Sequence, residues 1–233
     1  TRDIIVGILS DSENADNDEA INSIFLEKRK VKTTAIIVLT SDRGLCGGYN
    51  ANICKETYKK IQEIENDLFL IIVGSRGAEF FSDKGIEIKE TYKGISEKPS
   101  FEDAVRIGNL ISKLYKEEKV DEVILAYTEF ESVISHIPNL KKVLPLDSSD
   151  FEEKNEKNTK TGYNPLMIYD PGKEEVLNYI IPRYINTVIY SALSESAVCE
   201  IGARMTSMDS ATKNAEETID KMTIIYNRAR QGA

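Results

Sequence analysis

AIIVL, residues 35–39, is an unbroken aliphatic run, and this run decides the fold class. Such a run is typical of a strand buried on both faces, as in a sheet covered by helices on either side. Two similar runs follow, at Leu68–Val73 and at Val123–Tyr127. We expect these three segments to be the core strands of one sheet.

Helical patterns lie between the expected strands. After Asn50, which we expect to cap the first helix, apolar positions recur at helical spacing at Ile53, Thr57, Ile61 and Ile64. A short helix is expected over Arg76–Phe81. Ser100 and Asp103 have the spacing of a capping box, which predicts a third helix that continues through Leu114.

Weaker patterns complete the domain. Ile86–Tyr92 alternates like a strand, and the stretch Val133–Leu146 is expected to contain an antiparallel partner for the strand at 123–127. Residues 147–164 are polar and predict a mobile surface loop, followed by a last short strand at Leu166–Tyr169. Strands that alternate with helices specify a layered α/β sheet, which we place at residues 31–171.

The C-terminal part of the chain, residues 172–233, predicts one long helix. Only Pro182 interrupts the pattern, and it should either kink the helix or lie in its first turn. The 51 residues from Arg183 to Ala233 would span roughly 75 Å at ~1.5 Å per residue. A compact chain of this length is only about 45 Å across, so the helix must protrude.

An apolar seam follows the protruding helix at the 3, 4 spacing of a coiled coil. Its members are Val198, Ile201, Met205, Met208, Thr212, Ala215, Ile219, Met222, Tyr226 and Ala229. We interpret the methionines as seam packing rather than as a ligand surface. The partner strand is either another chain or an N-terminal helix mostly outside this sequence. The helical spacing within Thr1–Leu9 favours the second, so we assign residues 1–12 to the end of that helix.

Composition excludes several classes of function. Thirty Lys and Arg against thirty-nine Asp and Glu give a net charge of −9, which argues against nucleic acid as a partner. No apolar run approaches the roughly 20 residues that cross a bilayer, so direct membrane insertion is not expected. Cys46, Cys54 and Cys199 fit neither a metal site nor an even disulfide set, and we expect no metal and no cofactor. A catalytic triad could use only His136, which we interpret as a strand end.

The last thirteen residues carry Lys221, Arg228 and Arg230 and no acidic residue. This cationic tip contrasts with the acidic chain as a whole. Two interpretations stay open. The tip could bind an acidic partner, or the cations could simply stabilise the C-terminal end of a helix through its dipole.

The glycine turn, which we define as residues 41–50, joins the first core strand to a helix. An α/β fold often binds phosphate at this place. The spacing matches neither G-x-G-x-x-G nor G-x-x-x-x-G-K-[ST]. Gly47 and Gly48 could therefore serve only the turn, and a free-standing nucleotide-binding enzyme that uses Gly44–Gly48 is kept as an alternative.

Two long segments resemble the gamma subunit of the F-type ATP synthase. The first is TSDRGLCGGYN, residues 40–50. The second lies within residues 194–231 and contains ARM at 203–205, MDSATKNA at 208–215 and YNRARQ at 226–231. The resemblance implies a Rossmann-like α/β domain and an antiparallel coiled coil between the N- and C-terminal helices. It also implies a non-catalytic subunit.

The resemblance further implies a rotor shaft that couples ion-driven rotation to ATP synthesis or hydrolysis at sites on the beta subunits. The implied partners are three alpha and three beta subunits, an epsilon subunit and the membrane rotor ring. The implied location is peripheral, at the cytoplasmic face of a bacterial plasma membrane or the equivalent face in an organelle. A gamma relative in a dedicated hydrolytic motor is the alternative within the same family.

Four residues are assigned to contact with beta by this resemblance. Arg228, Arg230 and Gln231 match the closing motif of the family, which contacts an acidic loop of beta. Cys46 matches a region that faces the lever segment of beta. No insertion of the chloroplast type, with two regulatory cysteines, is visible, so regulation by thiols is not implied.

Overall fold

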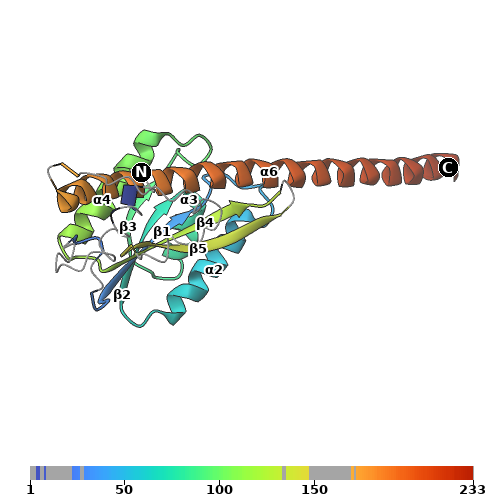
Figure 1. Cartoon of the computed structure of the whole chain (residues 1–233). Helices are drawn as coiled ribbons and strands as arrows, with labels where there is room; N and C mark the ends of the chain where they lie inside the picture. The colour runs from blue at the N-terminus through green and yellow to red at the C-terminus, as the bar shows by residue number, and fades with distance from the viewer. Residues whose placement is uncertain are drawn as a thin grey trace.

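The computed structural model describes residues 4, 5, 8, 23–26, 29–132, 135–146, 169–170 and 172–232. Figure 1 shows an α/β domain and one long helix that crosses the domain and extends far beyond it. The elements in chain order are β1 (Thr33–Leu39), α2 (Tyr49–Glu63), β2 (Asp67–Val73), α3 (Ser75–Ser82), β3 (Ile88–Tyr92), α4 (Phe101–Lys116), β4 (Glu122–Phe130), β5 (His136–Leu144) and α6 (Lys173–Gly232).

The strands form one five-stranded sheet in the order β3-β2-β1-β4-β5. The first four are parallel and β5 runs antiparallel to β4, as expected for the stretch 133–146. In the centre, Ile37 of β1 pairs with Ile71 of β2 and with Leu125 of β4. All five residues of the AIIVL run are buried, which confirms a strand covered on both faces.

Two apolar clusters, one on each face of the sheet, explain this burial. Ala35, Ile37 and Leu39 pack toward α4 and the first half of α6, whereas Ile36 and Val38 pack toward α2 and α3. The alternation is the ordinary period of a strand, whose successive side chains point to opposite faces. The domain therefore has three layers, helix, sheet and helix, as the sequence predicts (Figure 1).

Two expected helix starts have different outcomes. At α4, Ser100 Oγ accepts a hydrogen bond from the Asp103 amide and the Asp103 carboxylate accepts one from the Ser100 amide, which confirms the capping box. At α2, the expectation that Asn50 is the cap is wrong, because the helix begins at Tyr49 after Gly48. The Asn50 side chain is held by Ser41 instead, and its Oδ1 accepts from the Ser41 amide at 2.9 Å.

Helix α6 has 60 residues and is about 90 Å long at ~1.5 Å per residue. Pro182 is the tenth residue of this helix, so the expectation that it could lie in the first turn is wrong. Leu177, Ile181 and Ile185 are fully buried against the domain, whereas every described residue from Met208 onward is exposed. The first half of α6 therefore belongs to one helical layer of the domain, and its second half protrudes from the domain.

Three expectations concern the parts of the chain around this helix. The loop at 147–164 and the strand at 166–169 lie outside the described residues, apart from Tyr169, which is in no strand. Near the N-terminus, Ile4, Ile5 and Ile8 are helical, and Ile5 and Ile8 are buried in the cluster that contains α6. The division of the chain at residues 12, 31 and 172 stays a prediction. The first half of α6 contributes side chains to the domain core.

Candidate functional site

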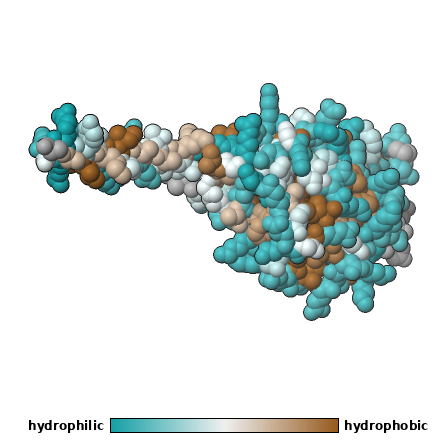
Figure 2. Space-filling model, turned by 180° about the vertical axis from the view of Figure 1, so that it is seen from behind, coloured by the Kyte–Doolittle hydropathy of each residue, from teal (hydrophilic) through white to brown (hydrophobic). Residues whose placement is uncertain are grey.

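The seam of α6 points into solvent. Hydrophobic residues recur along the protruding helix in Figure 2, and every seam residue from Val198 to Ala229 is exposed. The larger ones are between 45% and 66% exposed: Val198, Ile201, Met205, Met208, Ile219, Met222 and Tyr226. A row of exposed apolar side chains marks an interaction surface. The coiled coil itself stays a prediction.

The cationic tip lies at the far end of the same helix. Lys221, Arg228, Arg230 and Gln231 are all exposed on its last turns. Lys221 lies 3.8 Å from Glu217 one turn earlier, an exposed pair of the kind that contributes little. The tip is thus placed away from the domain, where it can reach a partner. Both interpretations of its charge remain compatible with this position.

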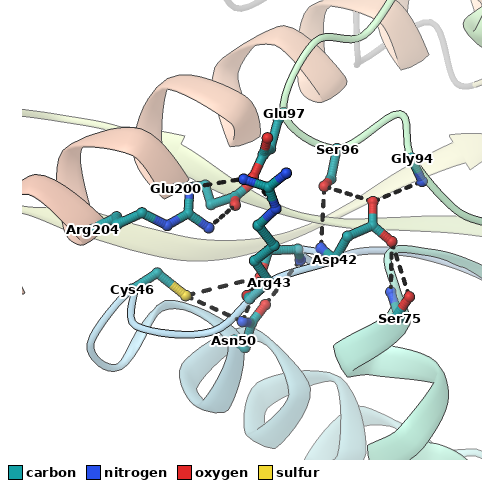
Figure 3. A network of polar contacts seen from close by, with 11 residues as sticks. Asp42, Arg43, Cys46, Asn50, Ser75, Gly94, Ser96, Glu97, Glu200 and Arg204 are labelled. Carbon is teal, nitrogen blue, oxygen red and sulfur yellow. Dashed lines mark hydrogen bonds and ion pairs between the residues drawn. The ribbon is translucent and has the colours of Figure 1, made fainter.

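A second polar site lies at the carboxyl ends of the parallel strands, where α/β folds commonly bind ligands. Here Asp42, just after β1, joins the loops that follow β2 and β3 (Figure 3). Its carboxylate accepts hydrogen bonds from the Ser75 amide at 3.1 Å, from the Gly94 amide at 2.8 Å and from the Ser75 and Ser96 hydroxyls at 3.0 Å. Partial burial raises the pKa of Asp42, but these hydrogen bonds outweigh it, and the pKa lies below its usual value.

The glycine turn is closed by its own side chains. Asn50 Nδ2 donates to Ser41 Oγ at 2.6 Å and to Cys46 Sγ at 3.2 Å. The backbone amides of Ser41 and Asp42 are bonded to Asn50 and Ser96, so these donors are not free to hold a phosphate. The thiol of Cys46 is only 2% exposed, whereas the neighbouring Leu45 is 74% exposed.

A cleft of about 390 Å³ opens between the glycine turn, the ends of β4 and β5, and α6. The cleft is lined by His136 and by several residues with hydroxyl groups, among them Thr128, Thr206, Ser207 and Ser210. No Lys or Arg is among the lining residues, which is a poor environment for the phosphates of a nucleotide. His136 is the first residue of β5, in agreement with its interpretation as a strand end.

The base of the shaft is fixed to this edge by charged residues that sequence reasoning missed. Arg204 of α6 binds Glu200 one turn earlier at 2.5 Å and Glu97 of the loop after β3 at 3.6 Å (Figure 3). The spacing of Glu200 and Arg204 could have signalled an ion pair on a helix. Nothing in the sequence signals that Glu200 is buried or that Glu97 comes within reach.

Within the described residues, no group of three or more His, Cys, Asp or Glu side chains could hold a metal ion. In the same residues, no helix is long and apolar enough to cross a bilayer. All three cysteines are buried free thiols.

A family model described as ATP synthase matches residues 3–233 of this chain. The ATP synthase gamma chain of Alkaliphilus metalliredigens is 45% identical over 215 residues, which cover 92% of this chain and 73% of that one. The chain belongs to the ATP synthase gamma chain family. Another gamma chain, named as sodium ion specific, from Acetobacterium woodii, is 40% identical over 237 residues, or 97% of this chain and 76% of the relative.

Solved structures from two ATP synthases share the fold. The central stalk of the Tetrahymena thermophila mitochondrial ATP synthase matches with a TM-score of 0.63 at 23% identity, over 90% of this chain and 97% of that one. The rotor of the Euglena gracilis enzyme matches with a TM-score of 0.63 at 16% identity, over 98% and 87%. At these identities the likeness concerns the fold, namely an α/β domain with a protruding helix.

Proposed function

We propose that this chain is the central, non-catalytic shaft of a rotary ATP synthase. The observation that carries the proposal is the double role of α6, whose first half is buried in the domain and whose last 25 described residues are exposed on all sides. A helix anchored in this way turns with its domain. It can therefore carry rotation from one end of the molecule to the other.

The mechanism needs no bond chemistry in this chain. Alpha and beta subunits, three of each, would surround the shaft, and its asymmetric surface would contact each beta subunit differently as it turns. Such differential contacts can shift a catalytic subunit between conformations, because a ligand shifts an equilibrium only by its unequal affinity for the two states. The structural neighbours named as central stalk and rotor support this role.

The domain end would join the epsilon subunit and the membrane rotor ring. The Tetrahymena structure is described as a central stalk with a c-ring, which supports a ring as partner. The chain would thus be peripheral to the membrane, at the cytoplasmic face in a bacterium. Its similarity to gamma chains from bacteria supports that location.

For contact with beta we propose the shaft tip, with Arg228, Arg230 and Gln231 toward an acidic loop. The glycine turn is the second proposed contact, opposite the lever segment of beta. Because Cys46 is buried, the exposed Arg43 and Leu45 are the side chains of this turn that would touch the partner. Cys46 would then act by packing the turn from within.

The test is the native mass of the complex that copurifies with this chain from its source, with ATP hydrolysis assayed on the same fraction. One copy of the chain with three alpha and three beta subunits, in an active fraction, is the expected result. A monomer or homodimer without ATPase partners would contradict the shaft role. In that case, titration calorimetry with ATP, ADP and NAD would test the glycine turn as a nucleotide site.

A further inference from the structure

Helix α6 passes from the domain into solvent within two turns, between Glu200 and Ser207. Glu200 is the last fully buried residue of the helix, at 1% exposure, and Arg204 follows one turn later. Beyond Ser207 every described residue of the helix is exposed. The contacts at this exit are therefore the last ones that the helix makes with its domain before it protrudes.

At the exit, one guanidinium joins two carboxylates from different elements. Arg204 Nη2 bonds Glu200 Oε1 within α6, and Arg204 Nη1 lies 3.6 Å from Glu97 Oε1 in the loop between β3 and α4. Arg43 of the glycine turn approaches the same Glu97 oxygen at 3.3 Å from the other side. Among the described residues, Glu200 Oε2 and Glu97 Oε1 are both buried without a hydrogen-bond partner, so the nearby guanidinium charge of Arg204 is the main compensation for Glu200 and an ion pair, not a hydrogen bond, joins it to Glu97.

The loop that carries Glu97 is itself anchored. The preceding residue, Ser96, donates to the Asp42 carboxylate and accepts from the Asp42 amide, and Asp42 also binds Ser75 and Gly94 (Figure 3). A continuous set of polar contacts therefore runs from the shaft helix to the ends of β1, β2 and β3. Neighbouring bonds in such a network restrain each other's geometry.

We infer that Glu200, Arg204 and Glu97 form a latch that fixes the angle of the shaft on its domain. This inference rests on the proposed function, since a shaft has to turn with its domain under load. Arg204 is a positioning residue here. Its planar guanidinium can bond two carboxylates at once, which a lysine ammonium cannot do with the same directionality.

Two buried cysteines of the chain can report whether the latch is closed. Cys199 is fully buried, donates a hydrogen bond to the Thr128 carbonyl of β4 at 3.5 Å, and packs with Cys46 and Tyr49 at the exit. Cys54 is equally buried but lies in the cluster between α2 and the sheet. A buried thiol is alkylated only when its surroundings open. Release of the latch should thus expose Cys199 and leave Cys54 unaffected.

The experiment measures alkylation of each cysteine in the assembled complex by peptide mass spectrometry. Glu97→Gln weakens the two outer contacts, with Arg204 and with Arg43, and should raise the Cys199 rate about two- to fivefold, because the Glu97 side chain is partly exposed. Arg204→Met should raise it about tenfold or more, because the buried Glu200 loses its partner. The Cys54 rate should stay constant, and the number of ions transported per ATP hydrolysed should fall in both variants.

Two further variants separate a latch from a merely structural ion pair. Lys213→Met removes an exposed pair of the same spacing, with Asp209 at 2.8 Å, from a part of α6 beyond the exit, and should leave the Cys199 rate unchanged. The double variant Glu200→Gln/Arg204→Met removes the buried carboxylate charge together with its partner, and it still lacks the contact with Glu97. Its Cys199 rate should stay high. Recovery of the parental rate would overturn the latch, because the single variant would then act only through an unpaired charge.

Failure of the two proposals can be told apart. A parental complex that lacks ATPase partners would contradict the shaft role, whatever the alkylation rates. An active complex in which Glu97→Gln and Arg204→Met alkylate like the parent would contradict the latch alone.

Discussion

At the scale of single residues, the side chain of Asp42 accepts four hydrogen bonds at the carboxyl edge of the sheet. Asp42→Ala removes an acceptor of four hydrogen bonds and should lower the free energy of unfolding by about 2–3 kcal/mol, since several donors lose a charged partner. Urea unfolding at pH 7 measures this. Asp42→Asn, which keeps one carbonyl oxygen, should lose less.

The contribution of Asp42 should also depend on pH. Its pKa in the folded chain lies below the usual value of 3.8, because the hydrogen bonds outweigh the effect of burial. A lowered folded pKa means that the stabilisation is present above the unfolded pKa and is lost as the pH falls through the folded one. The gap between parent and Asp42→Asn should therefore narrow below about pH 4. An equal gap at pH 7 and pH 3 would contradict this account.

Gly74 has a backbone φ of 94°, in the region that favours glycine. An added Cβ would lie 2.3 Å from the Thr40 carbonyl oxygen, in the backbone that follows β1. Gly74→Ala should destabilise the chain by about 3 kcal/mol or more, measured by urea unfolding. Gly85→Ala is the matched control: its φ is 70° but the space around it is open, so about 1 kcal/mol is expected. Equal losses would contradict a steric cause at Gly74.

At the scale of elements, the core of the fold could be predicted from local patterns. The aliphatic runs around Ile37, Ile71 and Leu125 became the central strands, because continuous burial and β-branching need no distant information. The start of α2 could not be placed, because Asn50 bonds back to Ser41 instead of capping its own helix. Such a contact depends on the shape of the whole turn.

The seam of α6 makes a prediction at this scale. Ile219 is 63% exposed in the described chain, so Ile219→Asn should change the stability of the isolated domain by less than about 0.5 kcal/mol. In the assembled complex it should cost about 2 kcal/mol, because the side chain would be buried against a partner helix. Thermal unfolding of both preparations measures the difference. Glu217→Asn, on the face opposite the seam, serves as control, and equal effects in both preparations would argue against the coiled coil.

At the scale of the whole molecule, the protruding helix could be predicted from sequence, but the contacts between Glu200, Arg204 and Glu97 could not. Glu200 and Arg204 lie one turn apart on any helix, yet burial of Glu200 and the approach of Glu97 exist only once the sheet and α6 are assembled. Contacts between distant segments depend on topology. Local spacing carries no information about them.

The tip makes the prediction that belongs to the complete assembly. Arg230→Ala should weaken coupling or lower ATP hydrolysis about fivefold, as expected if a contact of ~1 kcal/mol is lost, without unfolding the exposed helix end. Steady-state hydrolysis and ion transport by the purified complex measure this. Lys55→Ala, an exposed cation on α2, should have no effect. Parental rates for Arg230→Ala would count against the assignment of this residue.

The carboxylate of Asp42 lies at the carboxyl edge of the sheet, where many α/β proteins bind a ligand. In many α/β proteins the loops at this edge become ordered only when a metabolite arrives, so their stability follows its concentration. Here the anion is attached to the chain, and its effective concentration does not fall when cellular supplies do. The loops that follow β1, β2 and β3 are therefore held together by an anion that is always present, whatever the concentration of free anions.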